Sequence, residues 1–414
     1  MIQLNEKINA LGLDIPLSEH VEILREPLRL GAFKLRNRLA IQPMEGCDGT
    51  AAGRPGELTR RRYLRFAQSG AGLLWFEAVA IVPEGRANPR QLLVNQEHLD
   101  SLKYLVNEIK EISLKECGFV PAIIMQATHS GRYSKPEGIA AYENPERPPC
   151  KIITDDEIKL LEEAYGEATR LAILAGFDGI DVKACHGYLC SELLSAFTRP
   201  GEYGGSFENR AKLLINGVKA AQANAKPGFT VTSRLNIYDG YTPPNSFGLE
   251  ENMDEPLRLI DVLHNNLGMD LLNVTMGNPY QNPHVNRPFD HGPYQPPEHP
   301  LVGVERMYRL TGQMQQAFPG LAIMASGPSY LRQYGINLVA GAIEQNFCKI
   351  VGFGRQAFAY PQFARDALQS GRLEPGQCCI ACGKCSQLMR AGSTAGCVVR
   401  DSLYREIYER DVKQ

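Results

Sequence analysis

The sequence predicts a closed (β/α)8 barrel of the TIM type, followed by a small cysteine-rich segment. Eight short apolar runs recur along the chain, and most are separated by stretches of helix length. Such continuous runs are typical of parallel strands buried on both faces, and eight strands close a barrel of this type. The runs cover residues 39–43, 72–76, 120–125, 179–183, 230–235, 270–274, 321–325 and 349–353.

The clearest helix signal lies before the fourth run. Thr154 and Glu157 form a capping box, in which each side chain satisfies a free backbone donor at the helix start. Apolar residues follow at helical spacing until Gly176, where we expect the helix to end. A helix leading directly into a buried strand is the repeating unit of an α/β barrel.

Three titratable side chains, those of Lys183, His186 and Tyr188, gather where the fourth run ends. Asp181 and Lys183 alternate with apolar residues, so the two-residue period of a strand places both on one face, which we take as the interior. His186 and Tyr188 follow within a few positions. Ionisable groups just beyond the carboxyl end of a barrel strand are placed for chemistry rather than packing.

Length and composition fit one barrel with a small appendage. The chain has 414 residues, of which 43% are hydrophobic, and we expect a barrel over 1–372 and a cysteine-rich tail over 373–414. The net charge of −2 and the lack of a dense basic block argue against nucleic acid and anionic membrane as main partners. No apolar span is long enough to cross a bilayer, and residues 1–20 lack a secretory signal pattern, so we expect a cytoplasmic location.

Cysteines are concentrated after the eighth run. Of eleven cysteines, five lie between Cys378 and Cys397, and in a reducing compartment such clustering indicates a metal more often than disulfides. The spacing is Cys379-x2-Cys382-x2-Cys385, then eleven residues to Cys397, an arrangement that suits a [4Fe-4S] cluster. A structural zinc site and unliganded thiols are the alternatives.

Several segments, in order, resemble the old yellow enzyme family of FMN-dependent oxidoreductases. The likeness is strongest to the iron-sulfur branch that includes 2,4-dienoyl-CoA reductase, 2-enoate reductase and trimethylamine dehydrogenase. The matching segments are 35–38 (LRNR) leading to Pro43 and Met44, 83–86 (PEGR), Gln126 with 129–132 (HSGR), 186–189 (HGYL), Arg199, 202–210 (EYGGSFENR), Arg234 and 352–355 (GFGR).

The resemblance implies an FMN site at the carboxyl end of the barrel. Gln126 and Arg234 would supply donors to the flavin N1 and O2 edge, where negative charge develops on reduction. Pro43 and Met44 would line the ring. The phosphate would lie over the loops after the last two strands, at Ser326, Gly327, Gly354 and Arg355.

The resemblance also assigns substrate chemistry. Tyr188 matches the tyrosine that protonates the substrate α-carbon, and His186 matches one of a pair of residues that hold the substrate carbonyl oxygen. The other member of the pair is Lys183 here instead of histidine, which favours the dienoyl and enoate branch over simple enones. We expect Lys183 either to bind an acyl group or to form an ion pair with Asp181, and the ion pair is slightly favoured.

One loop departs from the family pattern, and a second loop offers further candidate residues. In the first, 45–48 (EGCD) replaces residues that usually approach the flavin C4 carbonyl, and Cys47 lies two residues past the position of a covalent flavin link. Covalent attachment is therefore not expected. In the second loop, after the sixth run, Tyr280 and His284 are candidates for a second proton donor.

The implied function is reduction of a carbon-carbon double bond conjugated to a carbonyl, carboxylate or thioester. Oxidative amine demethylation ranks lower because an aromatic amine site needs tryptophans and the chain has only Trp75. A non-catalytic electron-transfer subunit, or a barrel stabilised by zinc, is a further alternative.

The source of electrons stays open. Multidomain relatives continue beyond the cluster into further nucleotide-binding domains, whereas this sequence ends at Gln414. We therefore expect either NAD(P)H or a separate flavoprotein or ferredoxin as electron donor. The resemblance is compatible with a homo-oligomer.

Overall fold

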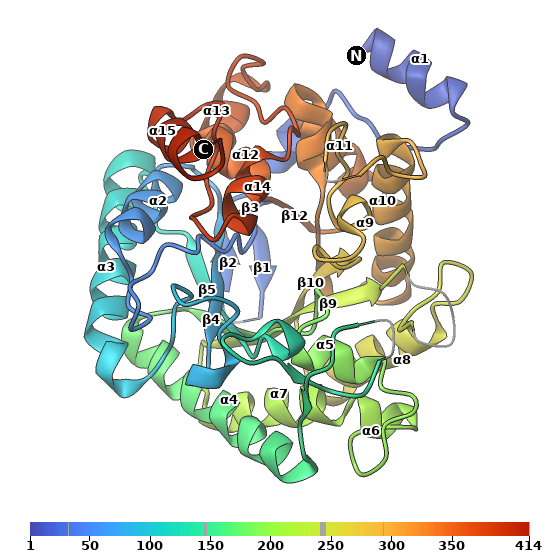
Figure 1. Cartoon of the computed structure of the whole chain (residues 1–414). Coiled ribbons are helices and arrows are strands. Elements are labelled where there is room, and N and C mark those ends of the chain that lie inside the picture. Colours follow the sequence, from blue (N-terminus) through green and yellow to red (C-terminus); the bar gives the residue numbers. More distant parts are fainter. Residues whose placement is uncertain (32, 145–146, 241–245, 293, 414) are drawn as a thin grey trace.

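The computed structural model describes residues 1–31, 33–144, 147–240, 246–292 and 294–413. Eight parallel strands close into a barrel in the order β10-β11-β12-β3-β4-β5-β8-β9, and helices surround it (Figure 1). Each predicted run overlaps one of these strands, so the predicted fold class is confirmed. The strands are β3 (Leu39–Ile41), β4 (Leu73–Ala80), β5 (Ala122–Thr128), β8 (Gly179–Val182), β9 (Thr230–Tyr238), β10 (Leu271–Met276), β11 (Ala322–Ala325) and β12 (Ile350–Phe353).

The longer helices follow the barrel strands along the chain. They are α2 (Glu57–Ala67), α3 (Leu99–Cys117), α4 (Asp155–Ala175), α7 (Lys212–Asn224), α8 (Asp254–Asp261), α10 (Pro300–Ala317), α11 (Gly335–Glu344) and α13 (Phe363–Ser370). Shorter helices are α5 (Leu189–Leu194), α6 (Phe207–Arg210), α9 (Pro283–Asn286) and α12 (Arg355–Ala359), and α1 (Ile2–Ala10) lies at the amino end. Across the described ranges, none of the helices has the length and hydrophobicity needed to cross a membrane.

Helix α4 shows how local sequence sets these boundaries. It begins after Thr154, whose hydroxyl accepts a hydrogen bond from the backbone of Glu157, while the Glu157 carboxylate accepts one from the Thr154 backbone. It ends at Gly176, which adopts a left-handed conformation with φ of 92°. The predicted start and end of this helix are both confirmed.

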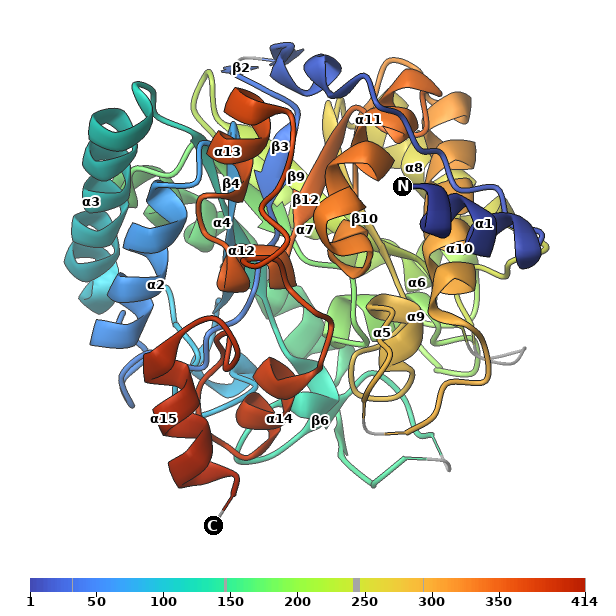
Figure 2. The same ribbon diagram turned by 90° about the horizontal axis from the view of Figure 1, so that it is seen from above.

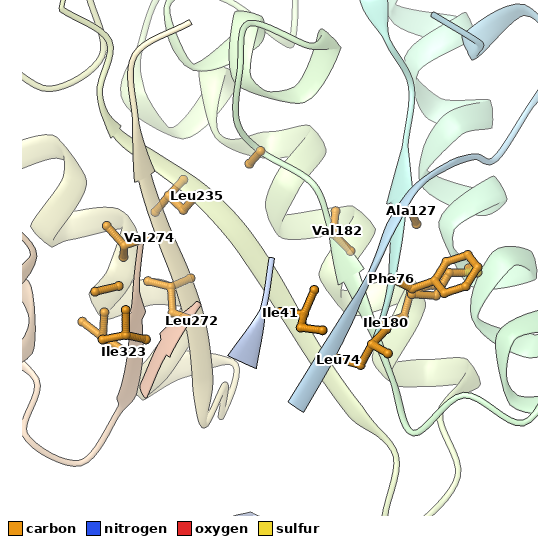
Figure 3. Close-up of a cluster of buried hydrophobic side chains, with 14 of the residues drawn as sticks. Ile41, Leu74, Phe76, Ala127, Ile180, Val182, Leu235, Leu272, Val274 and Ile323 are labelled. Atoms are coloured by element: carbon orange, nitrogen blue, oxygen red, sulfur yellow. The ribbon is translucent and has the colours of Figure 1, made fainter. Parts of the chain in front are cut away.

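The barrel core has two layers, because side chains alternate along each strand. Outward-facing side chains such as Ile41, Leu74, Val182 and Ile323 belong to a large cluster that includes the surrounding helices (Figure 3). Inward-facing side chains form a smaller cluster that includes Trp75. The hairpin of β1 (Leu28–Leu30) and β2 (Phe33–Leu35) contributes to that inner cluster, so it closes the amino-terminal end of the barrel.

The tail lies at the opposite end from this hairpin. In Figure 2, α14 (Lys384–Arg390) and α15 (Ser402–Asp411) lie near one end of the barrel and β2 lies near the other. The short pair β6 (Ile139–Ala140) and β7 (Lys151–Ile152) also belongs to the loops of the carboxyl-terminal end. Asp401 binds Arg61 of α2 at 2.8 Å, and the Ala395 amide donates to the Gly46 carbonyl at 2.8 Å. The division of the chain at residues 372 and 373 stays a prediction.

Candidate active site

One cavity at the carboxyl end of the barrel collects the residues proposed for flavin and substrate. All eleven of them line it, together with Glu45, Tyr280, Asn286, Arg287 and several residues of the tail. The eleven are Pro43, Met44, Gln126, Lys183, His186, Tyr188, Arg234, Ser326, Gly327, Gly354 and Arg355. They come from six of the eight strands and their loops, which is how a barrel assembles a site from distant parts of a chain.

Asp181 lies outside the cavity lining and holds two residues of that lining, Gln126 and Arg234, in place. It is fully buried and accepts three hydrogen bonds, from Trp75 Nε1 at 2.8 Å, Gln126 Nε2 at 2.7 Å and the Arg234 backbone amide at 2.6 Å. Burial raises the pKa of Asp181 to about 6 despite these donors. The carboxylate therefore fixes Gln126 and the strand carrying Arg234 beside one another.

The expected ion pair between Lys183 and Asp181 is wrong. The oxygens of Asp181 are taken up by the donors from three other strands, and no carboxylate in the described parts of the chain pairs with Lys183. The Lys183 ammonium instead lies 3.6 Å from the centre of the Tyr188 ring. Burial lowers the pKa of Lys183, and its side chain is available to the cavity.

Tyr188 is buried with its hydroxyl in a polar contact. Its Oη donates to Glu45 Oε2 at 3.3 Å and lies 3.2 Å from Tyr280 Oη. The Tyr280 ring stacks on Tyr133 at a centroid separation of 3.8 Å. Burial, and next the Glu45 carboxylate, raise the pKa of Tyr188 well above its ordinary value, so the phenol holds its proton.

The turn before Tyr188 has an unusual backbone. His186 and Gly187 have φ of 67° and 69°, and a side chain at Gly187 would collide with Asn278 Nδ2. A non-glycine residue held in the left-handed region is costly and clusters at functional sites. His186 Nε2 lies 3.1 Å from Asn286 Nδ2, and burial lowers the pKa of His186 well below its ordinary value, so the ring is neutral.

Arg234 has unused donor capacity in the cavity. Its Nη2 makes a long contact of 3.4 Å with Thr275, and within the described residues its buried Nε has no hydrogen-bond partner. A buried guanidinium without partners is costly unless a ligand supplies an acceptor. The side chain is thus suited to bind an anionic or carbonyl-rich group.

Three further arginines line one side of the cavity. Arg287 donates to Ser386, Arg355 to the Pro288 carbonyl at 2.8 Å, and Arg390 to the Pro279 carbonyl at 3.0 Å. None of the three has a carboxylate partner in the described ranges. Burial and the two neighbouring guanidiniums lower the pKa of Arg287 to about 10, against the opposing effect of Cys385. This cluster is a strong site for a phosphate.

The first loop is held by a buried ion network. Arg62 binds Asp48 through Nε at 3.0 Å and Nη2 at 2.9 Å, and binds Glu77 Oε1 at 2.5 Å. Glu77 Oε2 accepts from the Gly46 amide at 3.0 Å, and Arg62 Nη1 donates to the Met44 carbonyl at 3.3 Å. The backbone on both sides of Glu45 is therefore fixed.

Cys47 is not part of the cavity lining. Burial, and then three nearby carboxylates, raise its pKa well above the ordinary value, so the thiol is not activated as a nucleophile. This agrees with the expectation of no covalent flavin link. His284 also lies away from the cavity lining and contacts Tyr294, whereas Tyr280 lines the cavity.

A second, smaller cavity is lined by the five clustered cysteines. Cys379, Cys382, Cys385 and Cys397 all contribute, and so does Cys378, whose sulfur also contacts Gln356 at 3.4 Å. Across the described ranges, no group of three or more His, Cys, Asp or Glu side chains converges on a point that would hold one metal ion. Cys385 lines both cavities, as do Arg355 and Phe358.

The sequence reasoning missed some residues of the main cavity. Arg390 carried no signal, because nothing in the sequence shows that the tail folds over the barrel mouth. Asn286 ends α9 and Arg287 follows it, in the segment after β10, where polar residues beyond a strand end could have indicated them. Glu45 was noted only as a departure from the family pattern.

Comparison with curated proteins gives relatives along the barrel. NADPH dehydrogenase from Clostridium acetobutylicum is 30% identical over 247 residues, which are 55% of this chain and 69% of that protein. NADPH dehydrogenase from Geobacillus thermodenitrificans is 33% identical over 210 residues, which are 48% of this chain and 59% of that protein.

Solved structures share the fold at lower identity. A 2-naphthoyl-CoA reductase in complex with 2-naphthoyl-CoA has a TM-score of 0.77 at 20% identity, and the match covers 94% of this chain and 58% of that one. Histamine dehydrogenase from Rhizobium sp. 4-9 has a TM-score of 0.72 at 18% identity, covering 94% and 53%. The chain thus spans little more than half the length of these two proteins.

The family model for "NADH:flavin oxidoreductase / NADH oxidase family" matches residues 24–284, well over half of the chain. The match includes the first six barrel strands, from β3 to β10. The resemblance to old yellow enzyme is confirmed, and the chain belongs to the NADH:flavin oxidoreductase / NADH oxidase family of FMN-dependent oxidoreductases.

Proposed function

We propose that the protein reduces a carbon-carbon double bond conjugated to a carbonyl, carboxylate or thioester. The observation that supports this most is the position of Tyr188, a neutral phenol that lines the same cavity as the flavin-binding candidates Gln126 and Arg234. Lys183 and His186 line that cavity beside it. A proton donor and acyl-binding groups facing one flavin site are what such a reduction requires.

The residues present fit FMN. The partnerless Nε of Arg234 suits the acceptor edge of the isoalloxazine ring. The arginine cluster of Arg287, Arg355 and Arg390 suits the phosphate, and Ser326 and Gly327 lie in the same cavity. When bound, reduced FMN would supply a hydride to the substrate β-carbon.

The protein's own residues would bind the acyl group and move the proton. The Lys183 ammonium would attract a carboxylate or polarise a carbonyl, and neutral His186 would hydrogen-bond the same oxygen. Tyr188 would donate its proton to the α-carbon, and the nearby Lys183 charge would stabilise the resulting phenolate. Lys183 and Tyr188 are buried, and the exclusion of water strengthens their interactions.

The charges of the cavity favour alkene reduction over amine oxidation. Among the described residues, five cationic side chains line it, those of Lys183, Arg234, Arg287, Arg355 and Arg390, against one carboxylate, that of Glu45. An ammonium substrate would be repelled, and the Tyr188 ring that could bind it already carries the Lys183 ammonium. An anionic or neutral acyl substrate meets no such repulsion.

We further propose a [4Fe-4S] cluster held by Cys379, Cys382, Cys385 and Cys397. Four thiols lining one cavity support it, and thiolates are the usual ligands of such clusters. A single zinc ion requires four sulfurs about 2.3 Å from one point. A cubane is larger, so its ligands stand further apart. Because Cys385 and Arg355 border both cavities, a cluster there would lie beside the flavin site and could pass it electrons from a flavoprotein or ferredoxin.

We infer a cytoplasmic location from the thiols. All eleven cysteines are free, with no disulfide among the residues the structure describes. Free and clustered thiols persist in a reducing compartment. NAD(P)H remains the alternative electron donor at the cavity mouth.

Anaerobic reoxidation tests the proposed function. Purified protein should show flavin absorption with a broad iron-sulfur shoulder, and the reduced form should be reoxidised by at least one class among enoates, enoyl-CoA thioesters and cyclic enones. A colourless protein containing zinc, or reduced flavin that none of these acceptors reoxidises, would contradict the proposal.

A further inference from the structure

Glu45 is the acidic partner of Tyr188. It stands on the loop after β3, far from Tyr188 in sequence, yet its Oε2 accepts a hydrogen bond from the Tyr188 hydroxyl at 3.3 Å. Its other oxygen, Oε1, accepts from Asn88 Nδ2 at 2.7 Å. Resting on the proposed alkene reduction, we propose that Glu45 supplies the proton that replaces the one Tyr188 gives to the substrate.

Tyr188 needs a proton source inside the protein. The residue is only 3% exposed, and within the described residues its hydroxyl has two partners, Glu45 and Tyr280. Tyr280 is a phenol, and a phenol is a weak acid at neutral pH. A carboxylic acid is a far stronger acid than a phenol, which makes Glu45 the better donor to a Tyr188 phenolate.

The surroundings of Glu45 keep its acid form within reach. Burial raises the pKa of Glu45 above its ordinary value, although Lys183, Tyr188, Asn88 and Cys47 act in the opposite direction. The Lys183 ammonium lies on the face of the Tyr188 ring, and Glu45 lies at its hydroxyl. The phenol is thus placed between a cation that stabilises its anion and an acid that reprotonates it.

Protons pass from Glu45 through Tyr188 to the substrate in two transfers. The Tyr188 O–H bond breaks as a C–H bond forms at the substrate α-carbon, with the electron pair of the new bond coming from the former double bond. The Glu45 O–H bond then breaks as the Tyr188 O–H bond reforms, which leaves a carboxylate. Water entering the cavity, which Glu45 lines, returns the proton to Glu45.

The position of Glu45 is fixed from both sides of its backbone. The Gly46 amide donates to Glu77 at 3.0 Å, and the Met44 carbonyl accepts from Arg62 at 3.3 Å. A side chain held in this way can keep one geometry through each catalytic cycle. Glu45 therefore acts through Tyr188, as a positioned acid that does not itself contact the substrate carbon.

The test follows repeated reduction of an activated alkene by the holoenzyme under anaerobic conditions, with excess dithionite as the reductant, across a range of pH. In the wild type, the rate of repeated turnover should fall as rising pH removes the Glu45 proton. Glu45→Gln keeps the hydrogen-bonding shape but cannot donate in this way, so it should turn over at least about 10-fold more slowly at neutral pH and lose that alkaline decline. Glu45→Asp should retain the decline.

Two further variants separate a proton role from a structural one. Asn88→Ala removes a donor to the Glu45 carboxylate, which should raise its pKa and move the alkaline decline to higher pH. Glu84→Gln, at an exposed position, is the matched control for the same chemical change. Flavin content, read from the visible spectrum, confirms that each variant is compared as holoenzyme.

The outcomes are distinct. A Glu45→Gln variant with the wild-type rate, or one that is slow but retains the alkaline decline, overturns the role of Glu45. A loss confined to Tyr280→Phe would assign the proton supply to Tyr280 instead. A wild-type protein that reduces no activated alkene removes the proposed function itself, and the role of Glu45 with it.

Discussion

Replacing Arg62 by methionine should be strongly destabilising. The Arg62 side chain is 2% exposed and neutralises two carboxylates, Asp48 and Glu77, which are 0% and 1% exposed. Methionine fills a similar volume but leaves both acids buried without a cation. Breaking a buried ion pair on one side typically costs about 3–5 kcal/mol, and three short hydrogen bonds of Arg62 are lost here, so we expect about 4 kcal/mol.

The loss of stability in Arg62→Met should depend on pH. Burial raises the pKa of Glu77 from 4.5 to about 7, against the lowering effect of Arg62. Between pH 4.5 and about 7, folded Glu77 keeps a proton that the unfolded chain has released. The free energy of unfolding therefore falls as pH rises through this range. Without Arg62 the pKa rises further, so the difference between variant and wild type should be larger at pH about 8 than at about 5.

Chemical denaturation followed by circular dichroism measures this difference, with FMN at a fixed concentration in all samples. Arg60→Met on the same helix removes only an exposed pair with Glu108 and should leave the midpoint nearly unchanged. A loss below about 1 kcal/mol for Arg62→Met, or one that does not vary with pH, would refute the reasoning.

Three other changes test the site. Tyr188→Phe should slow alkene reduction about 10²–10⁴-fold while leaving reduction of the flavin intact in stopped-flow traces, and equal loss in both half-reactions would contradict its role. Lys183→Met should raise the KM for enoates about 10-fold or more, because a hydrogen bond to a charged group is worth about 1.5–3 kcal/mol, and an unchanged KM would exclude carboxylate binding. Cys382→Ser should lose iron and the broad visible absorption, whereas Cys117→Ser on α3 should retain both. Full iron content in the first variant would disprove the ligand assignment.

Much of the fold could be predicted because a parallel barrel strand has a simple signature. A short apolar run buried on both faces is visible in the sequence, and strand alternation correctly placed Lys183 toward the interior. The family motifs then identified residues that the barrel brings to one cavity. The division of the chain at residue 372, and the individual roles of the cavity residues, stay predictions.

What could not be predicted depends on contacts between strands distant in sequence. Asp181 and Lys183 share a face, which suggested an ion pair, but cross-strand register gives Asp181 the donors of Trp75, Gln126 and the Arg234 backbone instead. The pairing of Glu45 with Tyr188 joins loops of two strands that are not neighbours in the barrel. Neither contact leaves a local pattern in the sequence.

The hairpin of β1 and β2 has a kinetic consequence. Because it packs on the inner cluster at one end of the barrel, a small molecule would reach the cavity from the carboxyl-terminal end. A small-molecule reductant and the oxidising substrate would then occupy the same space one after the other, and the two could not be bound at the same time. Initial velocities measured with both reagents varied would give a family of parallel reciprocal lines when a small molecule is the reductant, and intersecting lines when electrons enter by way of the tail.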